Sequence, residues 1–178
     1  MYAIRKSIDI DFSHHIAGHA GNCVNLHGHT WKFEVGLASS ALTPEGFVVD
    51  FKTLKQGVLA PCHDLLDHSL ALGVTMFDTI SQELEATGTA LLATRIPIHG
   101  TTDTAPRNAV EVNGAFNCFP GGMKVAIFPF SPTSERLARW LYDLAVQVLE
   151  NERVEVQFAR VYETLHPVES VAEYQRKR

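Results

Sequence analysis

Histidines are crowded near the start of this sequence. Of the 178 residues nine are histidine, and five of these lie between positions 14 and 29. His27 and His29 are separated by one residue, so on a strand both imidazoles point to the same side. Gly28 leaves the space between them clear. Because neutral imidazole is the commonest zinc ligand, this pair predicts a zinc site.

A third histidine joins the pair if two strands form a hairpin. Residues 2–14 alternate, with Ile10, Phe12 and then His14 on the apolar face, and residues 27–37 repeat the pattern. In an antiparallel pair, the end of the first strand lies beside the start of the second. The sequence therefore predicts Zn²⁺ held by His14, His27 and His29, with an open fourth position as in catalytic sites. The alternative is that these are sheet-end histidines that bond to the backbone.

Two other histidines lie nearby but are not expected to bind the metal. By alternation His15 points to the opposite face from His14. His19 lies in the loop predicted over 15–26, and could be a ligand only if the strand register differs from the expected one.

Cys23 lies in the same loop, four residues before His27. A nearby divalent cation favours the thiolate, which makes Cys23 a candidate base or nucleophile. Alternatively, Cys23 is a fourth ligand that closes the zinc site. Cys62 and Cys118 have no such neighbours and are expected to be buried or incidental thiols. Three cysteines are too few for a disulfide framework, so all are expected to be reduced.

Asp67 and His68 place a carboxylate beside an imidazole, a pairing that can orient a proton-transferring histidine. Neighbours in sequence need not bond each other. Without other evidence, a surface pair is the default interpretation.

The remaining pattern predicts the elements that must position these residues. The spacing predicts a short helix capped by Asp50 that ends before Pro61, a longer helix over 131–149, and strands over 154–162 and 170–174. Residues 76–123 fit this plan least well. They are expected to form an insertion with a helix around 77–86.

Composition excludes several classes of function. With 46% hydrophobic and 20% charged residues, the chain is expected to form one globular domain over 1–178. The formal net charge of −5 gives no drive toward nucleic acid. No apolar run reaches the ~18–20 residues of a membrane span, and the start lacks a signal-peptide core, so a cytoplasmic protein is expected.

Six short motifs occur in an order typical of one known family. They are Ile10–His14, Cys23–His29, Val48–Lys55, Leu66–His68, Pro132–Glu135 and Tyr162–Thr164. Over most of the chain outside 76–123, the sequence resembles the 6-pyruvoyltetrahydropterin synthase / 6-carboxytetrahydropterin synthase family. The resemblance implies the α+β tunnelling fold, an antiparallel sheet with helices packed on one face, here with the insertion at about 76–123.

The resemblance also implies a role for each matched position. The implied zinc ligands are His14, His27 and His29, the implied catalytic residues are Cys23, Asp67 and His68, and the implied substrate-binding residues are Glu163, Thr133 and Glu135. Glu163 would hold the pterin ring through its amino and ring N–H groups. Strand alternation places Glu163 on the same side as Gln157 and Val161, away from Phe158.

The implied substrate is 7,8-dihydroneopterin triphosphate, and the implied assembly is a homo-oligomer, a trimer or dimer of trimers with active sites between subunits. The three-residue gap between Cys23 and His27 resembles that of the bacterial queuosine-pathway 6-carboxytetrahydropterin synthases. This resemblance implies 6-carboxytetrahydropterin as the product, with loss of acetaldehyde and triphosphate. The alternative product is 6-pyruvoyltetrahydropterin. Two other hypotheses are a zinc-stabilised binding protein without turnover, which would need neither Cys23 nor Glu163, and an unrelated zinc hydrolase.

Overall fold

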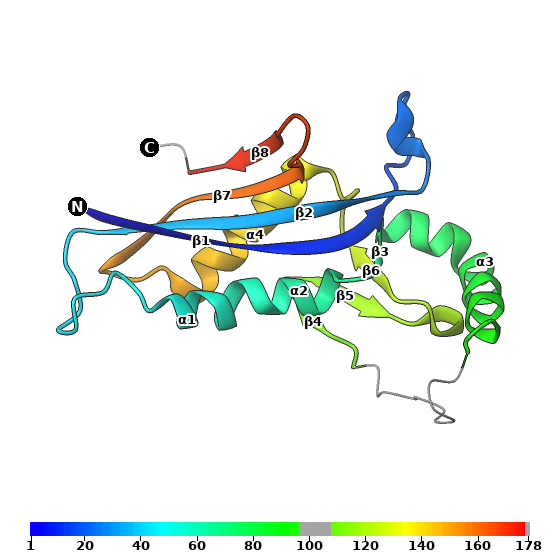
Figure 1. Ribbon diagram of the computed structural model, residues 1–178, viewed down its shortest axis with the longest axis horizontal. Helices are drawn as coiled ribbons and strands as arrows, with labels where there is room; N and C mark the ends of the chain where they lie inside the picture. Colours follow the sequence, from blue (N-terminus) through cyan, green and yellow to red (C-terminus); the bar gives the residue numbers. More distant parts are fainter. Residues whose placement is uncertain (97–107, 177–178) are drawn as a thin grey trace.

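An open sheet forms the centre of the molecule (Figure 1). The computed structural model describes residues 1–96 and 108–176. Their strands are β1 (Tyr2–His14), β2 (His27–Ser39), β3 (Leu70–Gly73), β4 (Glu111–Val112), β5 (Ala115–Cys118), β6 (Val125–Phe128), β7 (Val154–Thr164) and β8 (Ser170–Tyr174). Their helices are α1 (Phe51–Leu54), α2 (Ala60–Leu66), α3 (Val74–Ala93) and α4 (Ser134–Leu149). Across the sheet the strand order is β4-β5-β6-β3-β1-β2-β7-β8.

The hairpin of β1 and β2 is the longest pairing in the described sheet. The strands run antiparallel from Tyr2 opposite Ser39 to His14 opposite His27. Both predicted strands are confirmed, and so is their antiparallel pairing. The hairpin therefore places the end of β1 at the start of β2, where the histidines lie.

The sheet is mixed, so the predicted antiparallel sheet is wrong in one part. β3 pairs in parallel with β1 on one side and with β6 on the other. Parallel neighbours need a crossover connection. Helices α1 and α2 carry the chain from β2 to β3, and α3 lies in the connection from β3 to β6. As a result, β1, β3 and β6 run in one direction. Strands of four residues are too short to show alternation in the sequence.

Two hydrophobic clusters cover the two faces of the sheet. In the larger cluster, β1, β2 and β7 pack against α1, α2 and α4. Ala71 and Phe128 face this cluster, whereas Leu72 and Ile127 face a second cluster that α3 covers through Leu84. The predicted packing of helices on one face is therefore wrong for α3. β3 and β6 are apolar on both faces, and both faces must be covered.

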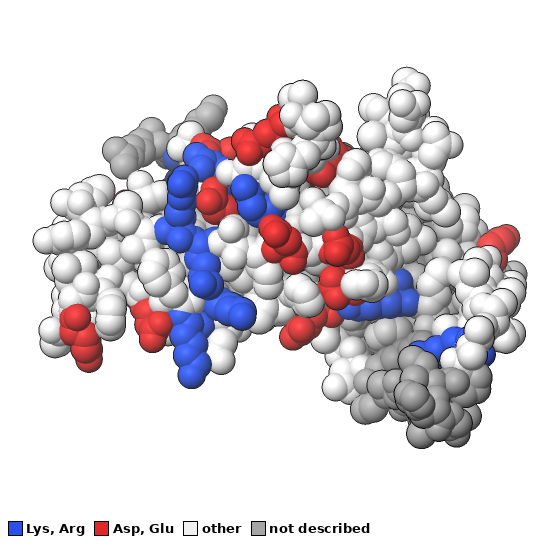
Figure 2. Space-filling view, viewed as in Figure 1, with Lys and Arg blue, Asp and Glu red and all other residues white. Residues whose placement is uncertain are grey.

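The face of β1, β2 and β7 away from the larger cluster is polar. Figure 2 shows a band of Lys and Arg side chains across this region, with Asp and Glu side chains beside it. Arg5 and Arg160 pair with Glu34 at 3.7 Å and 3.2 Å, and Lys32 lies over the ring of Tyr162. The hairpin thus follows the apolar-in, polar-out rule of antiparallel sheets.

The helix that begins after Asp50 does not end before Pro61, contrary to the prediction. The Asp50 side chain caps α1 by accepting a hydrogen bond from the Lys52 N–H, as expected. A π turn over Lys55–Leu59 then leads into α2, where Pro61 occupies the first turn. Proline lacks the N–H that a helix interior would bond, and the π turn before it alters the bonding pattern at this point.

The predicted helix over 131–149 and both C-terminal strands are confirmed as α4, β7 and β8. The alternation predicted along β7 is wrong, because the pairing with β2 shifts register between Gly36 and Leu37. Val156 and Ala159 therefore lie in the core, and Phe158 does not. The Phe158 ring covers Gly36, where an added Cβ would approach the ring to 2.3 Å.

The predicted helix around 77–86 lies within α3, and β4 and β5 add two strands to the main sheet. Whether residues 76–123 are an insertion stays a prediction, and 97–107 lie outside the described residues. In the described ranges, no helix has both the length and the hydropathy needed to cross a membrane.

Candidate active site

Three histidines and a glutamate converge at the end of the β1–β2 hairpin. His14, His27, His29 and Glu163 each offer a donor atom, and these atoms lie within 4.8 Å of one another. His14 is opposite His27 in the hairpin register, and His29 follows on the same face. The structure therefore brings together the three histidines predicted as metal ligands.

The hydrogen bonds of the histidines fit a bound cation. His14 Nδ1 lies 3.1 Å from the Pro132 carbonyl oxygen, and His27 Nδ1 lies 2.8 Å from the Asn25 carbonyl oxygen. A neutral imidazole that donates through Nδ1 carries a lone pair on Nε2. The two Nε2 atoms are only 3.0 Å apart. Two facing lone pairs repel each other, and a cation between them would remove this conflict.

Burial keeps His14 and His29 in the ligand form. Desolvation lowers the pKa of His14 to about 4, and the charges of the neighbouring histidines add to this effect. Desolvation also lowers the pKa of His29, against the raising effect of Glu163. His29 Nε2 is buried and accepts no hydrogen bond. Both imidazoles lie edge-to-face on Trp31, which forms an apolar floor.

Glu163 lies at the histidine cluster, two residues after buried Val161 on β7. One carboxylate oxygen lies 3.5 Å from His14 Nε2 and 3.8 Å from His29 Nε2. The sequence predicted a pterin anchor here, and the structure adds that the same oxygen is within reach of a metal. Glu163 lies on the same face of β7 as Val161, as predicted. Gln157 does not share that face, because the bulge in β7 interrupts the alternation between the two residues.

The loop between β1 and β2 carries Cys23 in a 3₁₀ turn over Asn22–Val24. The loop projects from the hairpin end (Figure 1). Cys23 is half-buried, and its carbonyl oxygen accepts a hydrogen bond from the Ile16 N–H. Its sulfur is not among the four converging donors, which disfavours the closed four-ligand site. His15 and His19 are also outside this group, as predicted.

Gly28 does not clear space between the two imidazoles, contrary to expectation. An added Cβ would meet Phe12 O at 3.4 Å and Ser13 at 3.6 Å, both ordinary contacts. Alternation points this position to the other face, so His27 and His29 need no glycine between them.

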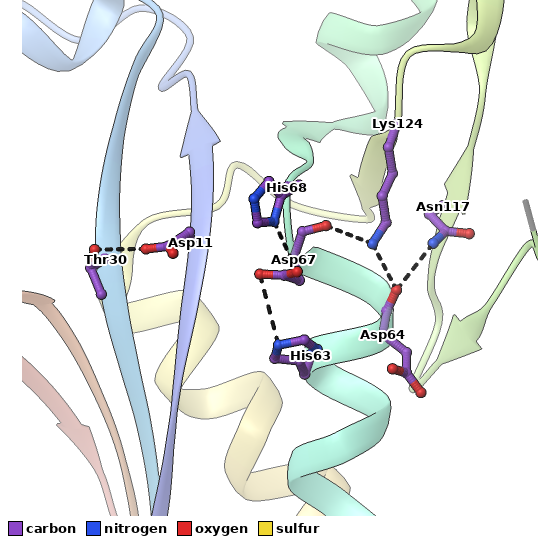
Figure 3. A network of polar contacts seen from close by, with 8 residues as sticks. All are labelled: Asp11, Thr30, His63, Asp64, Asp67, His68, Asn117 and Lys124. Carbon is purple, nitrogen blue, oxygen red and sulfur yellow. Dashed lines mark hydrogen bonds and ion pairs between the residues drawn. The ribbon is translucent and has the colours of Figure 1, made fainter. Parts of the chain in front are cut away.

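Asp67 and His68 do bond each other, with 2.9 Å between Asp67 Oδ2 and His68 Nδ1 (Figure 3). Burial alone would raise the pKa of Asp67, but the hydrogen bond to His68 and the charges of His63 and His68 lower it. His68 lines a cavity with Asp11, Ser13 and Gly28. His29 of the histidine cluster lines the same cavity. Neither Asp67 nor His68 is among the four converging donors.

Two residues that the sequence did not indicate hold this pair in place. Lys124 Nζ donates to the carbonyl oxygens of Asp64 and Asp67, both at 2.8 Å (Figure 3). His63 Nε2 lies 3.8 Å from the second oxygen of Asp67. Lys124 thereby satisfies carbonyls at the end of α2, where His68 adopts a positive φ of 56°. Its distance of 57 residues from Asp67 left no local signal.

The start of α4 orients His14, one of the candidate metal ligands. Thr133 caps the helix by accepting a hydrogen bond from the Arg136 N–H, and Glu135 lies exposed in the first turn. The carbonyl oxygen of Pro132, the residue before the cap, accepts a hydrogen bond from His14 Nδ1. Within the described residues, Thr133 and Glu135 thus have helix-starting roles, and their predicted contact with substrate stays a prediction.

Fold and donor set together describe an α+β enzyme with a candidate metal centre at a hairpin end. The family model for 6-pyruvoyl tetrahydropterin synthase matches residues 3–177. The chain therefore belongs to this family, and it is a lyase of the tetrahydropterin synthase type.

Individual relatives agree with this assignment. The 6-carboxy-5,6,7,8-tetrahydropterin synthase of Haemophilus influenzae is 25% identical over 92% of this chain and 94% of its own length. That of Aquifex aeolicus is 29% identical over 72% of this chain and 59% of its own. An uncharacterized protein from Wolinella succinogenes shares the fold with a TM-score of 0.67, 22% identity, and coverage of 99% of this chain and 98% of its own. A Plasmodium vivax 6-pyruvoyltetrahydropterin synthase shares the fold with a TM-score of 0.52 and 15% identity, and the match covers 99% of this chain and 100% of that one.

Proposed function

We propose that the protein is a zinc-dependent lyase that converts 7,8-dihydroneopterin triphosphate to 6-carboxy-5,6,7,8-tetrahydropterin, releasing acetaldehyde and triphosphate in queuosine biosynthesis. The observation that carries this proposal is the pair of Nε2 lone pairs of His14 and His27, 3.0 Å apart beside His29. The Haemophilus and Aquifex relatives, both named for the carboxy product, support the choice of product.

Each proposed catalytic residue has one task. A bound zinc ion would act as a Lewis acid on the side-chain hydroxyls of the substrate and acidify the adjacent carbon. Cys23 takes a proton from that carbon as a thiolate base. His68, held by Asp67 at 2.9 Å, gives or takes a second proton. Glu163 orients the pterin by accepting hydrogen bonds from its amino and ring N–H groups.

Two alternatives remain, and one experiment separates them. The family description favours 6-pyruvoyltetrahydropterin as the alternative product, and a zinc-stabilised binding protein would form no product. The protein should be incubated with zinc and dihydroneopterin triphosphate, and the products identified by mass. The carboxy product should appear with one acetaldehyde per turnover. A pyruvoyl product, or unchanged substrate, would refute the proposal.

We expect Glu163→Gln to weaken pterin binding without releasing zinc. Gln keeps the shape but places an amide donor against the pterin donors, and a lost charged hydrogen bond costs about 1.5–3 kcal/mol, on the order of 10–100-fold in affinity. Calorimetric titration of biopterin or sepiapterin measures this, with zinc measured on the same samples. Loss of zinc would instead make Glu163 a metal ligand, and equal pterin affinity would remove its anchoring role.

We further propose that each active site forms between two copies in a trimer or dimer of trimers. The support is that neither Asp67 nor His68 is among the four converging donors of one chain. Cys23→Ala and His68→Ala should each be inactive alone. Refolded together at equal amounts, they should restore activity at about a quarter of the sites, since a shared site takes each residue from a different subunit. No recovery in a mixed oligomer would place both residues in one subunit.

A further inference from the structure

A second cavity opens beside the metal cluster, at the carboxyl ends of the parallel strands β1, β3 and β6. Its volume is about 280 Å³. It is lined by the segments that follow these strands, at His15, Val74 and Ser131, and by Arg136 of α4. Carboxyl ends of neighbouring parallel strands are where open sheets bind ligands. None of the lining residues belongs to the four-donor cluster.

Two residues that line this cavity each carry a polar atom without a partner. His15 Nδ1 and Ser131 Oγ are both shielded from solvent and make no hydrogen bond. A buried polar group left unpaired costs about 1–3 kcal/mol, so such groups in a native protein call for an explanation. A ligand with several hydrogen-bond acceptors in the cavity would lie next to both residues.

The charge of the cavity selects an anion. Arg136 contributes a guanidinium, and no carboxylate lines the cavity among the described residues. A guanidinium presents several donors in a planar fork that matches phosphate oxygens. Together, Arg136, Ser131 and His15 offer a cation, a hydroxyl and an imidazole to one ligand.

On two chain segments, a residue that lines the cavity is the sequence neighbour of a residue at the histidine cluster. His15 follows His14, and Ser131 precedes Pro132, whose carbonyl oxygen holds His14 Nδ1 at 3.1 Å. A substrate whose hydroxylated side chain lies at the histidines can therefore extend its far end into the cavity. In the proposed substrate, that far end is a triphosphate.

We propose that this cavity binds the triphosphate arm of the substrate, with Arg136 as its principal charged contact. This inference rests on the proposed function for the identity of the ligand. The cavity itself, its unpartnered atoms and its guanidinium are independent of the reaction that the metal site performs.

The test is calorimetric titration of sodium tripolyphosphate into the full-length protein at constant ionic strength. Arg136→Gln should raise the Kd by about tenfold or more, as expected for a lost charged hydrogen bond. Arg139→Gln removes the same charge from the same helix, one turn further on and outside this cavity, and should bind as wild type does. Ser131→Ala should weaken binding by a smaller factor. Wild-type affinity in Arg136→Gln, as would occur if a metal ion alone held the anion, would overturn the proposal.

Turnover separates the inference from the proposed function. With dihydroneopterin triphosphate, Arg136→Gln should raise KM, and an unchanged KM in an active enzyme would refute the cavity assignment alone. Arg136-dependent binding of tripolyphosphate without any turnover would refute the proposed reaction while retaining the anion site.

Discussion

Replacing His27 with Ala should remove most of the bound zinc. The substitution deletes one of the two Nε2 donors that lie 3.0 Å apart and leaves two imidazoles, which rarely retain the ion. Zinc affinity should fall by at least the ~10–100-fold that loss of an outer-shell partner causes. Metal analysis of protein purified with zinc in the buffer measures the occupancy, which should drop from about one per chain to a small fraction.

His19→Ala is the matched control for this experiment. His19 is an exposed histidine in the loop between β1 and β2, and it is not among the four converging donors. Its removal should therefore leave zinc content unchanged. Circular dichroism of both variants checks that the fold persists. Full zinc content in His27→Ala would disprove the three-histidine site.

Cys23→Ala should abolish most turnover while zinc and assembly persist. The thiol is proposed to move a proton, and general acid–base catalysis contributes typically 10²–10⁴-fold, so kcat should fall by about that factor. The sulfur lies outside the four-donor group, so its loss should not disturb the metal. Steady-state rates and metal content on the same preparation measure both effects.

Cys118→Ala is the control for loss of a thiol elsewhere. Cys118 is half-buried on β5, where burial raises the pKa of its thiol, and its removal should leave turnover near the wild-type level. Loss of zinc together with turnover in Cys23→Ala would instead indicate a closed site in which the thiol is the fourth ligand.

The candidate metal site could be predicted because it depends on local patterns. His27 and His29 share a face by strand alternation, and the hairpin places His14 beside them. Long strands carry enough residues for this alternation to be read. The same reasoning found α4, whose apolar stripe covers four turns.

What the sequence did not reveal depends on contacts between distant segments. The parallel pairing of β3 with β1 and β6 joins strands of four residues, and no pattern of that length separates parallel from antiparallel. The extra residue in β7, opposite Gly36 and Leu37 of β2, shifts the face of every residue before Phe158 in β7, which a strict period of two cannot foresee. Lys124 supports Asp67 from 57 positions away.

The carbonyl oxygen that holds His14 belongs to Pro132, immediately before the cap of α4, so the metal ligand is oriented by the packing of that helix. The unfolded chain has no such arrangement, and the proposed zinc ion would therefore bind the folded state in preference. By mass action, a metal at a thousandfold excess over its Kd would add about 4 kcal/mol to the stability of the fold. Zinc supply in the cell would then govern the abundance of this protein as well as its activity.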